Sequence, residues 1–140
     1  MLVAKALWAH LQKKAHMTCE LSPYACMPNT MSIGAMSAVL GRYPDLLYAP
    51  LEIKGDAEVH ALSRCQMILT EAKKRAQREY EQTLQRTGFT PADVRAYVDR
   101  HPEMRRATYR IPSADVTGTA ARLVLDVARR RGVKLVRSSG

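Results

Sequence analysis

The sequence lacks an apolar run that could cross a bilayer, which would need about 18 consecutive apolar residues. Its amino terminus, MLVAKALWAHLQKK, is interrupted by Lys5 and His10 too early to form the apolar region of a secretory signal. We therefore expect a cytoplasmic protein that has no membrane partner.

Cysteine is also scarce, with only Cys19, Cys26 and Cys65 in 140 residues. Three thiols cannot all pair with one another, and a reducing compartment keeps them free, so no structural disulfide is expected. His16, Cys19, Cys26 and either His60 or Cys65 could converge on zinc, but a Cys-x6-Cys spacing is not typical of structural zinc sites. Small buried thiols and solvent-facing histidines are the simpler interpretation.

Aromatic residues are few and scattered, with one Trp, one Phe and six Tyr. Positive charge, in contrast, is abundant, because 22 Lys and Arg oppose 13 Asp and Glu and give a formal net charge of +9. Most of this excess lies in residues 56–140, where seventeen basic side chains oppose ten acidic ones. They are mainly arginines, whose planar guanidinium suits phosphate, so the charge favours a polyanionic partner.

The basic residues form three clusters, any of which could also be an ordinary solvated surface. The clusters are Lys73, Lys74 and Arg78; then Arg105, Arg106 and Arg110; and then Arg129, Arg130, Arg131, Lys134 and Arg137. Like charges four residues apart on a helix repel each other, and a polyanion would relieve that repulsion. Together the clusters predict contact with the phosphates of DNA or RNA rather than with bases, because no aromatic platform accompanies them.

Hydrophobic spacing predicts a mainly α-helical chain. The expected helices cover residues 2–16, 29 or 30 to 40, 57–87, 91–100, and a segment that begins at Ser113 and stops before Gly132. Pro23 and Pro28 predict a loop over residues 18–30. The expected β component comprises a hairpin over residues 45–54 and strands over 106–111 and 133–137.

These elements predict one domain over residues 1–140, a helical bundle with one long central helix and a small β component. Its first part, residues 1–55, is nearly neutral, and its second part, residues 56–140, is basic. At about 1.5 Å per residue, the helix over 57–87 would be roughly 45 Å long. That exceeds what the core of one small domain needs, so the far end of the helix is expected to serve another purpose.

The stretch GRYPDLLYAPLEIKG, residues 41–55, contains the pair PD, a gap of six residues, and then EIK. This spacing resembles the active-site signature of the PD-(D/E)xK nucleases. The resemblance implies that Asp45 and Glu52 bind Mg²⁺ and that Lys54 is the catalytic lysine. Some branches of that family carry a glutamine in the following helix, a position that Gln66 would match.

The geometry of a hairpin would suit this resemblance. If Tyr48-Ala49 is a two-residue turn, Asp45 faces Glu52 across the ladder and Lys54 lies on the same face. The alternative is a surface hairpin that carries three charges and buries its leucines.

The leading hypothesis for function is a non-enzymatic, basic accessory protein, or small helical subunit of a nucleoprotein complex, that binds nucleic acid without a cofactor. Other protein subunits or copies of the chain itself are expected as further partners. A Mg²⁺-dependent nuclease is the first alternative. A protein-interaction module, such as an inhibitor or oligomeric adaptor, is the second, because of the long helix and the segment with Met27, Met31 and Met36.

Overall fold

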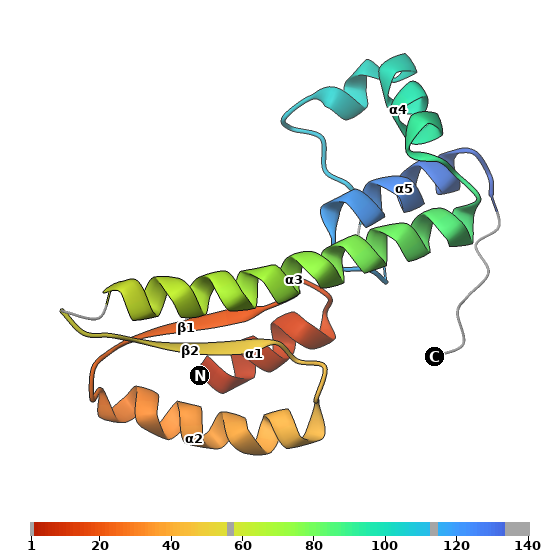
Figure 1. Cartoon of the computed structure of the whole chain (residues 1–140). Coiled ribbons are helices and arrows are strands. Elements are labelled where there is room, and N and C mark those ends of the chain that lie inside the picture. Colours follow the sequence, from red (N-terminus) through yellow and green to blue (C-terminus); the bar gives the residue numbers. More distant parts are fainter. Residues whose placement is uncertain (1, 56–57, 113–114, 134–140) are drawn as a thin grey trace. The chain divides into compact units, whose positions relative to one another are not determined.

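A computed structural model describes residues 2–55, 58–112 and 115–133 (Figure 1). The elements are α1 (Leu2–Leu11), β1 (Thr18–Pro23), α2 (Met27–Arg42), β2 (Tyr48–Ile53), α3 (Glu58–Thr87), α4 (Pro91–Arg100), η1 (Pro102–Arg105) and α5 (Thr119–Arg130). The predicted class, mainly α with one long helix and a small β component, is confirmed. The chain divides into two compact units, Met1–Arg75 (unit 1) and Ala76–Gly140 (unit 2), and α3 contributes to both.

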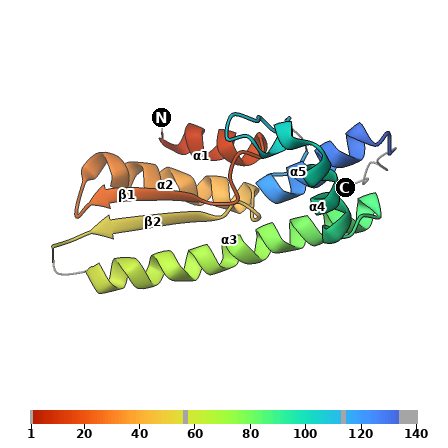
Figure 2. The same ribbon diagram turned by 90° about the horizontal axis from the view of Figure 1, so that it is seen from above.

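Unit 1 is built on a β1-α2-β2 motif. β1 pairs with β2 in parallel, so that Thr18 lies opposite Tyr48 and Pro23 opposite Ile53. Parallel strands need a crossover connection, which α2 supplies. Figure 1 and Figure 2 show α1 and α2 on one side of the sheet and the unit 1 part of α3 on the other. The sheet therefore has helices beside both of its faces.

β1 occupies part of the segment that we predicted as a loop over residues 18–30. That prediction was wrong because neither proline interrupts an element. Pro23 is the last residue of β1, and Pro28 lies in the first turn of α2, where the N–H that proline lacks would have no partner within the helix. α2 consequently begins at Met27, earlier than predicted, and ends at Arg42.

β2 replaces the hairpin that we predicted over residues 45–54. Tyr48 and Ala49, the expected turn, are the first two residues of one continuous strand. Its partner β1 lies 30 positions earlier in the sequence. Local turn chemistry could not reveal this pairing, because parallel strands are joined by a long crossover rather than by a turn.

The helical layer of unit 1 has a small core. α1 ends at Leu11 rather than at residue 16, and Lys13 follows with a positive φ of 51° that a helix cannot continue through. The buried core residues beneath α1 and α2 are Ala6, Met36 and Leu46. They hold α1 and α2 together on one face of the sheet.

Unit 2 has a core formed by four elements. Tyr80 and Leu84, from the second part of α3, pack against buried side chains of α4, η1 and α5, which are Val94, Met104, Val124 and Val127. A second buried group joins Val116 to Ala121 and Leu125 of α5. The second part of α3 therefore forms one side of this core.

Local capping residues set the end of α3 and the start of α4. Gly88 has a φ of 70° and ends α3, a conformation that glycine adopts readily. The Thr90 hydroxyl accepts the Asp93 N–H at 3.2 Å, while the Asp93 carboxylate accepts the Thr90 N–H at 2.9 Å. This reciprocal pair is a capping box, and α4 extends from Pro91 to Arg100 as predicted.

Two other predictions for unit 2 were wrong. Residues 106–111, predicted as a strand, form no strand, and the Tyr109 N–H donates to the Arg106 carbonyl at 2.9 Å within a turn. α5 begins at Thr119, later than predicted; Ser113 lies outside the described residues. Of the last predicted strand, residues 133–137, only Val133 belongs to the described residues.

The start of α5 is held by a side chain of α3. The N-cap residue of α5 is Gly118, which has no side chain that could cap the helix. Glu79 replaces that cap, because its carboxylate accepts the Thr117 N–H at 2.7 Å and the Gly118 N–H at 2.6 Å. A carboxylate here also meets the positive end of the helix dipole. Glu79 thereby fixes α5 against the part of α3 that belongs to unit 2.

We expect Glu79→Gln to lower the free energy of unfolding of unit 2 by roughly 2 kcal/mol, because an amide replaces a charged acceptor of two N–H groups. Amide hydrogen exchange in α5 measures the change. Glu81→Gln is the matched control, since Glu81 is exposed on the same helix and accepts an N–H from Gln77 at 2.7 Å. Equal protection of α5 in both variants would contradict the prediction.

Candidate functional site

The carboxylates of the nuclease-like motif lie at opposite ends of one strand. Asp45 precedes β2, where its carboxylate is 3.3 Å from His10 Nε2 and its backbone carbonyl accepts a hydrogen bond from the Arg75 guanidinium. Glu52 is the penultimate residue of β2. At about 3.3 Å per residue, the strand from Tyr48 to Glu52 alone spans about 13 Å. The facing arrangement that a hairpin would create is therefore absent from this pair.

Lys54 and Gln66 make other contacts. The Lys54 ammonium lies 5.4 Å from the centre of the Tyr24 ring. Gln66 is exposed on α3, and its backbone carbonyl accepts the Thr70 hydroxyl at 2.8 Å. Within the described ranges, no group of three or more His, Cys, Asp or Glu side chains could hold a metal ion. The structure does not bring together the set of side chains that the resemblance implies.

A buried polar cluster, which the sequence did not predict, lies between the sheet and α2. Glu20 of β1 is only 8% exposed. Its carboxylate accepts the hydroxyl of Ser32 from α2 and the hydroxyl of Tyr48 from β2, each at 2.5 Å. Ser22, two residues along β1 and thus on the same face, is also buried. One side chain therefore links three elements of unit 1.

The chemistry of Tyr48 follows from this cluster. Burial, and the hydrogen bond and negative charge of Glu20, raise the pKa of the Tyr48 phenol well above its usual range. The segment TCELSP does alternate, which was the available signal for a strand, but the polar residues Glu20 and Ser22 are the buried ones. Because alternation is normally interpreted with the apolar set inside, the cluster was not predictable.

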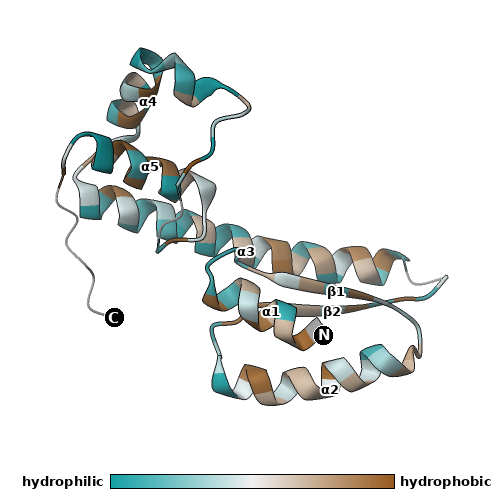
Figure 3. Cartoon of the chain, turned by 180° about the vertical axis from the view of Figure 1, so that it is seen from behind, coloured by the Kyte–Doolittle hydropathy of each residue, from teal (hydrophilic) through white to brown (hydrophobic). Residues whose placement is uncertain are grey.

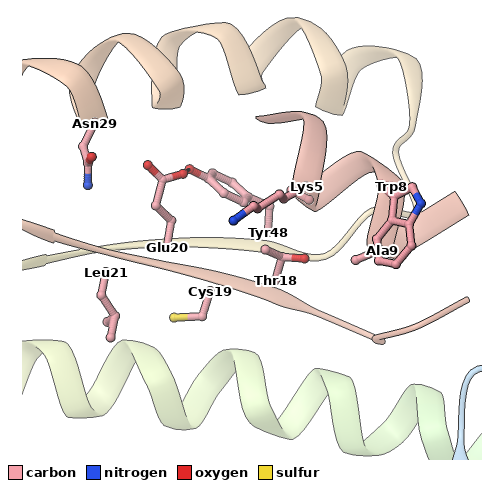
Figure 4. A pocket seen from close by; sticks show the side chains of 10 residues that line it. Lys5, Trp8, Ala9, Thr18, Cys19, Glu20, Leu21, Asn29 and Tyr48 are labelled. Atoms are coloured by element: carbon pink, nitrogen blue, oxygen red, sulfur yellow. Dashed lines mark hydrogen bonds between the residues drawn. The ribbon is translucent and has the colours of Figure 1, made fainter. Parts of the chain in front are cut away.

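A cavity of about 750 Å³ lies beside this cluster (Figure 4). Its walls come from α1, β1, β2 and the start of α2, and the lining residues include Lys5, Trp8, Cys19, Glu20 and Asn29. Figure 4 shows Lys5, Glu20 and Tyr48 close to one another on the α2 side of the strands. The volume is in the range of about 300–1,000 Å³ that is typical of binding pockets.

Two thiols interact on the other side of β1. Burial raises the pKa of the Cys19 thiol, and Cys65 of α3 raises it further through charge and through a hydrogen bond between the two thiols. All three cysteines are free thiols. A raised pKa leaves less of the reactive thiolate at neutral pH.

Exposed apolar side chains are concentrated in unit 1. The first part of α3 leaves Val59 78% exposed and Met67 69% exposed. The other large hydrophobic residues with exposed side chains are Trp8, Leu11, Leu21, Tyr24, Met27, Met31, Ile53, Leu62 and Leu69. Figure 3 shows this apolar character along the strands and the unit 1 part of α3. None of the described residues of unit 2 belongs to this set.

Some arginines that we predicted to bind nucleic acid are engaged within unit 2. The Arg130 guanidinium donates to the Tyr109 hydroxyl at 3.1 Å and lies 3.5 Å from the Asp126 carboxylate. Tyr109 in turn donates to buried Asp126. Arg131 lies over the rings of Phe89 and Tyr97, each 5.2 Å from its guanidinium carbon. These two arginines therefore contribute to the fold, although both stay exposed.

The other predicted basic residues that the structure describes are also exposed: Lys73, Lys74, Arg78, Arg105, Arg106, Arg110 and Arg129. Arg105 lies 3.7 Å from the Asp99 carboxylate. Arg106, Arg110 and Arg129 have no ion-pair partner among the residues that the structure describes. Lys134 and Arg137 lie outside the described ranges. The predicted clusters thus contain both structural arginines and solvent-facing ones.

We expect Tyr48→Phe to lower the free energy of unfolding of unit 1 by roughly 1–3 kcal/mol, because it removes one donor from a buried carboxylate. Urea unfolding monitored by the fluorescence of Trp8, the single tryptophan, measures it. Tyr24→Phe is the control, since Tyr24 is 63% exposed and its loss should cost less than about 0.5 kcal/mol.

The raised pKa of Tyr48 adds a pH dependence. In the unfolded chain the phenol ionises near pH 10, its ordinary pKa, whereas in the folded chain it ionises only at higher pH. Its contribution to stability is therefore complete below about pH 10 and is lost as pH rises further. Tyr48→Phe should lose less stability than the wild type as pH rises from about 10 to about 12. If the free energies of unfolding of the wild type and of Tyr48→Phe change equally with pH, this assignment is contradicted.

Comparison of the chain with protein-family models, with curated proteins and with solved structures found no match. Within the described ranges, no helix combines the length and the apolar character that crossing a bilayer requires.

Proposed function

We propose that the chain is a protein-interaction module and that its interface lies on unit 1. The observation that carries this proposal is that every exposed large hydrophobic side chain of the described residues belongs to unit 1. Three of them, Leu21, Ile53 and Leu62, border one cavity. Grouped exposed apolar side chains commonly mark interaction sites. A partner that covers these side chains would remove them from water.

The small sheet supports the same function. A two-stranded sheet is marginal on its own, and parallel sheets occur almost only where both faces are covered. Here Leu21 is 62% exposed and Ile53 is 53% exposed. With Leu62 of α3 they border a cavity of about 460 Å³, so the first part of α3 leaves the apolar face of the sheet incompletely covered.

The charge of the amino-terminal part of unit 1 favours a partner that carries acidic groups. Residues 2–19 contain Lys5, Lys13 and Lys14 but no Asp or Glu. The acidic residue that follows, Glu20, is buried and bonded to two hydroxyl groups. A partner surface that carries acidic as well as apolar side chains would complement this part of unit 1.

We expect Leu62→Gln combined with Met67→Gln to weaken the complex with the partner protein at least about tenfold, because two apolar side chains that the partner would bury are replaced by polar ones. A photo-cross-linking residue at position 62 identifies the partner in cells. The complex is then reconstituted from purified proteins, without nucleic acid, and its mass and affinity are measured by light scattering and calorimetry.

Arg64→Gln combined with Lys73→Gln is the matched control, since both residues are exposed and polar on the same helix. Failure to obtain a complex of defined mass would contradict the proposal. Equal affinity of the two double variants would contradict it as well.

Phosphate contact by unit 2 is the second candidate function, in which the chain is a basic accessory protein or subunit of a nucleoprotein complex. What supports it is that Arg106, Arg110 and Arg129 are exposed without an ion-pair partner among the described residues. Such guanidinium groups are available to phosphates, whereas Arg130 and Arg131 are engaged by aromatic and acidic side chains.

We expect Arg106, Arg110 and Arg129, changed together to Ala, to reduce the salt dependence of binding to mixed DNA or RNA. Each lost phosphate contact should reduce the slope of log K against log salt by about 0.7–0.9. The control removes three charges from unit 1, with Arg42, Lys54 and Arg64 changed to Ala. Binding that does not depend on salt, or equal slopes in both triple variants, would end this candidate.

A further inference from the structure

The hydrogen-bond pattern of the sheet identifies which backbone groups of β1 point outward. The Thr18 N–H donates to the Leu47 carbonyl at 2.9 Å, and the Tyr24 N–H donates to the Ile53 carbonyl at 3.1 Å. In a parallel ladder alternate residues of a strand bond to the same neighbour, so the even-numbered residues of β1 face β2. The backbone groups of Cys19 and Leu21 therefore point away from β2.

The two edges of the sheet differ in what they can accept. On β2 the outward residues include Pro50, which lies inside the strand and has no N–H to donate. Proline at such a position protects an edge from pairing with another strand. On β1 the outward proline is Pro23, the last residue, so Cys19 and Leu21 keep both donor and acceptor.

The β1 edge also has no backbone partner within the described ranges. No hydrogen bond from the backbone of Cys19 or Leu21 to another segment occurs there. The 750 Å³ cavity adjoins this edge, because Cys19 and Leu21 line it together with Lys5 and Trp8 of α1 and Asn29 of α2. Side chains of an added strand would find space there (Figure 4).

The two faces beside this edge call for different side chains. On the α2 side, exposed Lys5 has no ion-pair partner in the described chain, and the Glu20 carboxylate already accepts two hydroxyl groups. An acidic side chain there would complement Lys5. On the α3 side, exposed Leu21 and Leu62 border the second cavity, which suits apolar side chains.

We infer that an extended segment of a partner protein, with acidic and apolar residues in alternation, adds to the β1 edge as a third strand. The inference rests on the proposed interaction function and names its site and the chemistry of its partner. Backbone hydrogen bonds to Cys19 and Leu21 supply the attachment, and alternate side chains reach Lys5 and the apolar face.

Synthetic peptides test this with the full-length chain. The probe is a fluorescent heptapeptide of alternating Glu and Val, and fluorescence anisotropy measures its affinity. Two analogues are N-methylated, one at every Val and the other at every Glu. Only one edge of an added strand faces β1, so one analogue should bind about tenfold more weakly and the other should bind like the parent.

Two variants of the chain test the site. Leu21→Pro removes an outward N–H at a position equivalent to those of Pro23 and Pro50. It should weaken binding of the parent peptide about tenfold, whereas Leu21→Val should leave that affinity unchanged. Lys5→Glu should reverse the preference between the Glu-Val peptide and a Lys-Val peptide. Trp8 fluorescence verifies that each variant is folded.

Three results would overturn the inference. They are the absence of peptide binding below about 1 mM, equal affinity of both N-methylated analogues and the parent, and a dimer that Leu21→Pro converts to monomer. The last result would make a second copy of this chain the occupant of the edge.

The proposed function is tested separately, by the affinity of the Leu62 and Met67 double variant for the purified partner protein. A complex that is sensitive to that variant, with no peptide binding, retains the function and removes only the edge inference.

Discussion

The buried carboxylate of Glu20 is the interaction on which the arrangement of unit 1 depends. It accepts one hydroxyl from Ser32 of α2 and one from Tyr48 of β2, so it ties both elements to β1. Burying a carboxylate is costly unless it is hydrogen-bonded, and the two hydroxyl groups supply those hydrogen bonds. Because the polar face of β1 turns toward α2, its apolar face, with Leu21, turns toward α3 and remains largely exposed. The polar cluster and the exposed surface are two consequences of one strand orientation.

α3 serves a different purpose in each unit, which accounts for its length. In unit 2 its side chains are used internally, since Tyr80 and Leu84 join the core and Glu79 holds the start of α5. In unit 1 the same helix leaves Val59 and Met67 mostly exposed. An amphipathic helix gains most of its stability from burying its apolar face. The part of α3 in unit 1 therefore draws less stability from its own chain than the part in unit 2.

The sequence could predict elements whose signals are local and not those whose partners are distant. α3 and α4 were predictable because the Gly88 terminus and the capping box of Thr90 and Asp93 lie within a few residues. β1 and β2 were not, because a parallel pair 30 residues apart has no turn signature. The basic clusters were visible in the sequence. The structural role of Arg130 was not, because its partner Tyr109 is 21 residues away.

Neither the β1 edge nor the exposed apolar residues would hold a partner alone. A net backbone hydrogen bond is worth only about 0.5–1.5 kcal/mol, and Cys19 and Leu21 offer few of them. Association costs about 4–15 kcal/mol in lost freedom of motion. Burying a large apolar side chain contributes roughly 1.5–3 kcal/mol, so several of them must be covered at once. An added strand reaches both kinds of group, because Leu21 belongs to the edge through its backbone and to the apolar face through its side chain. The edge then sets the register of the partner, and the apolar residues supply most of its affinity.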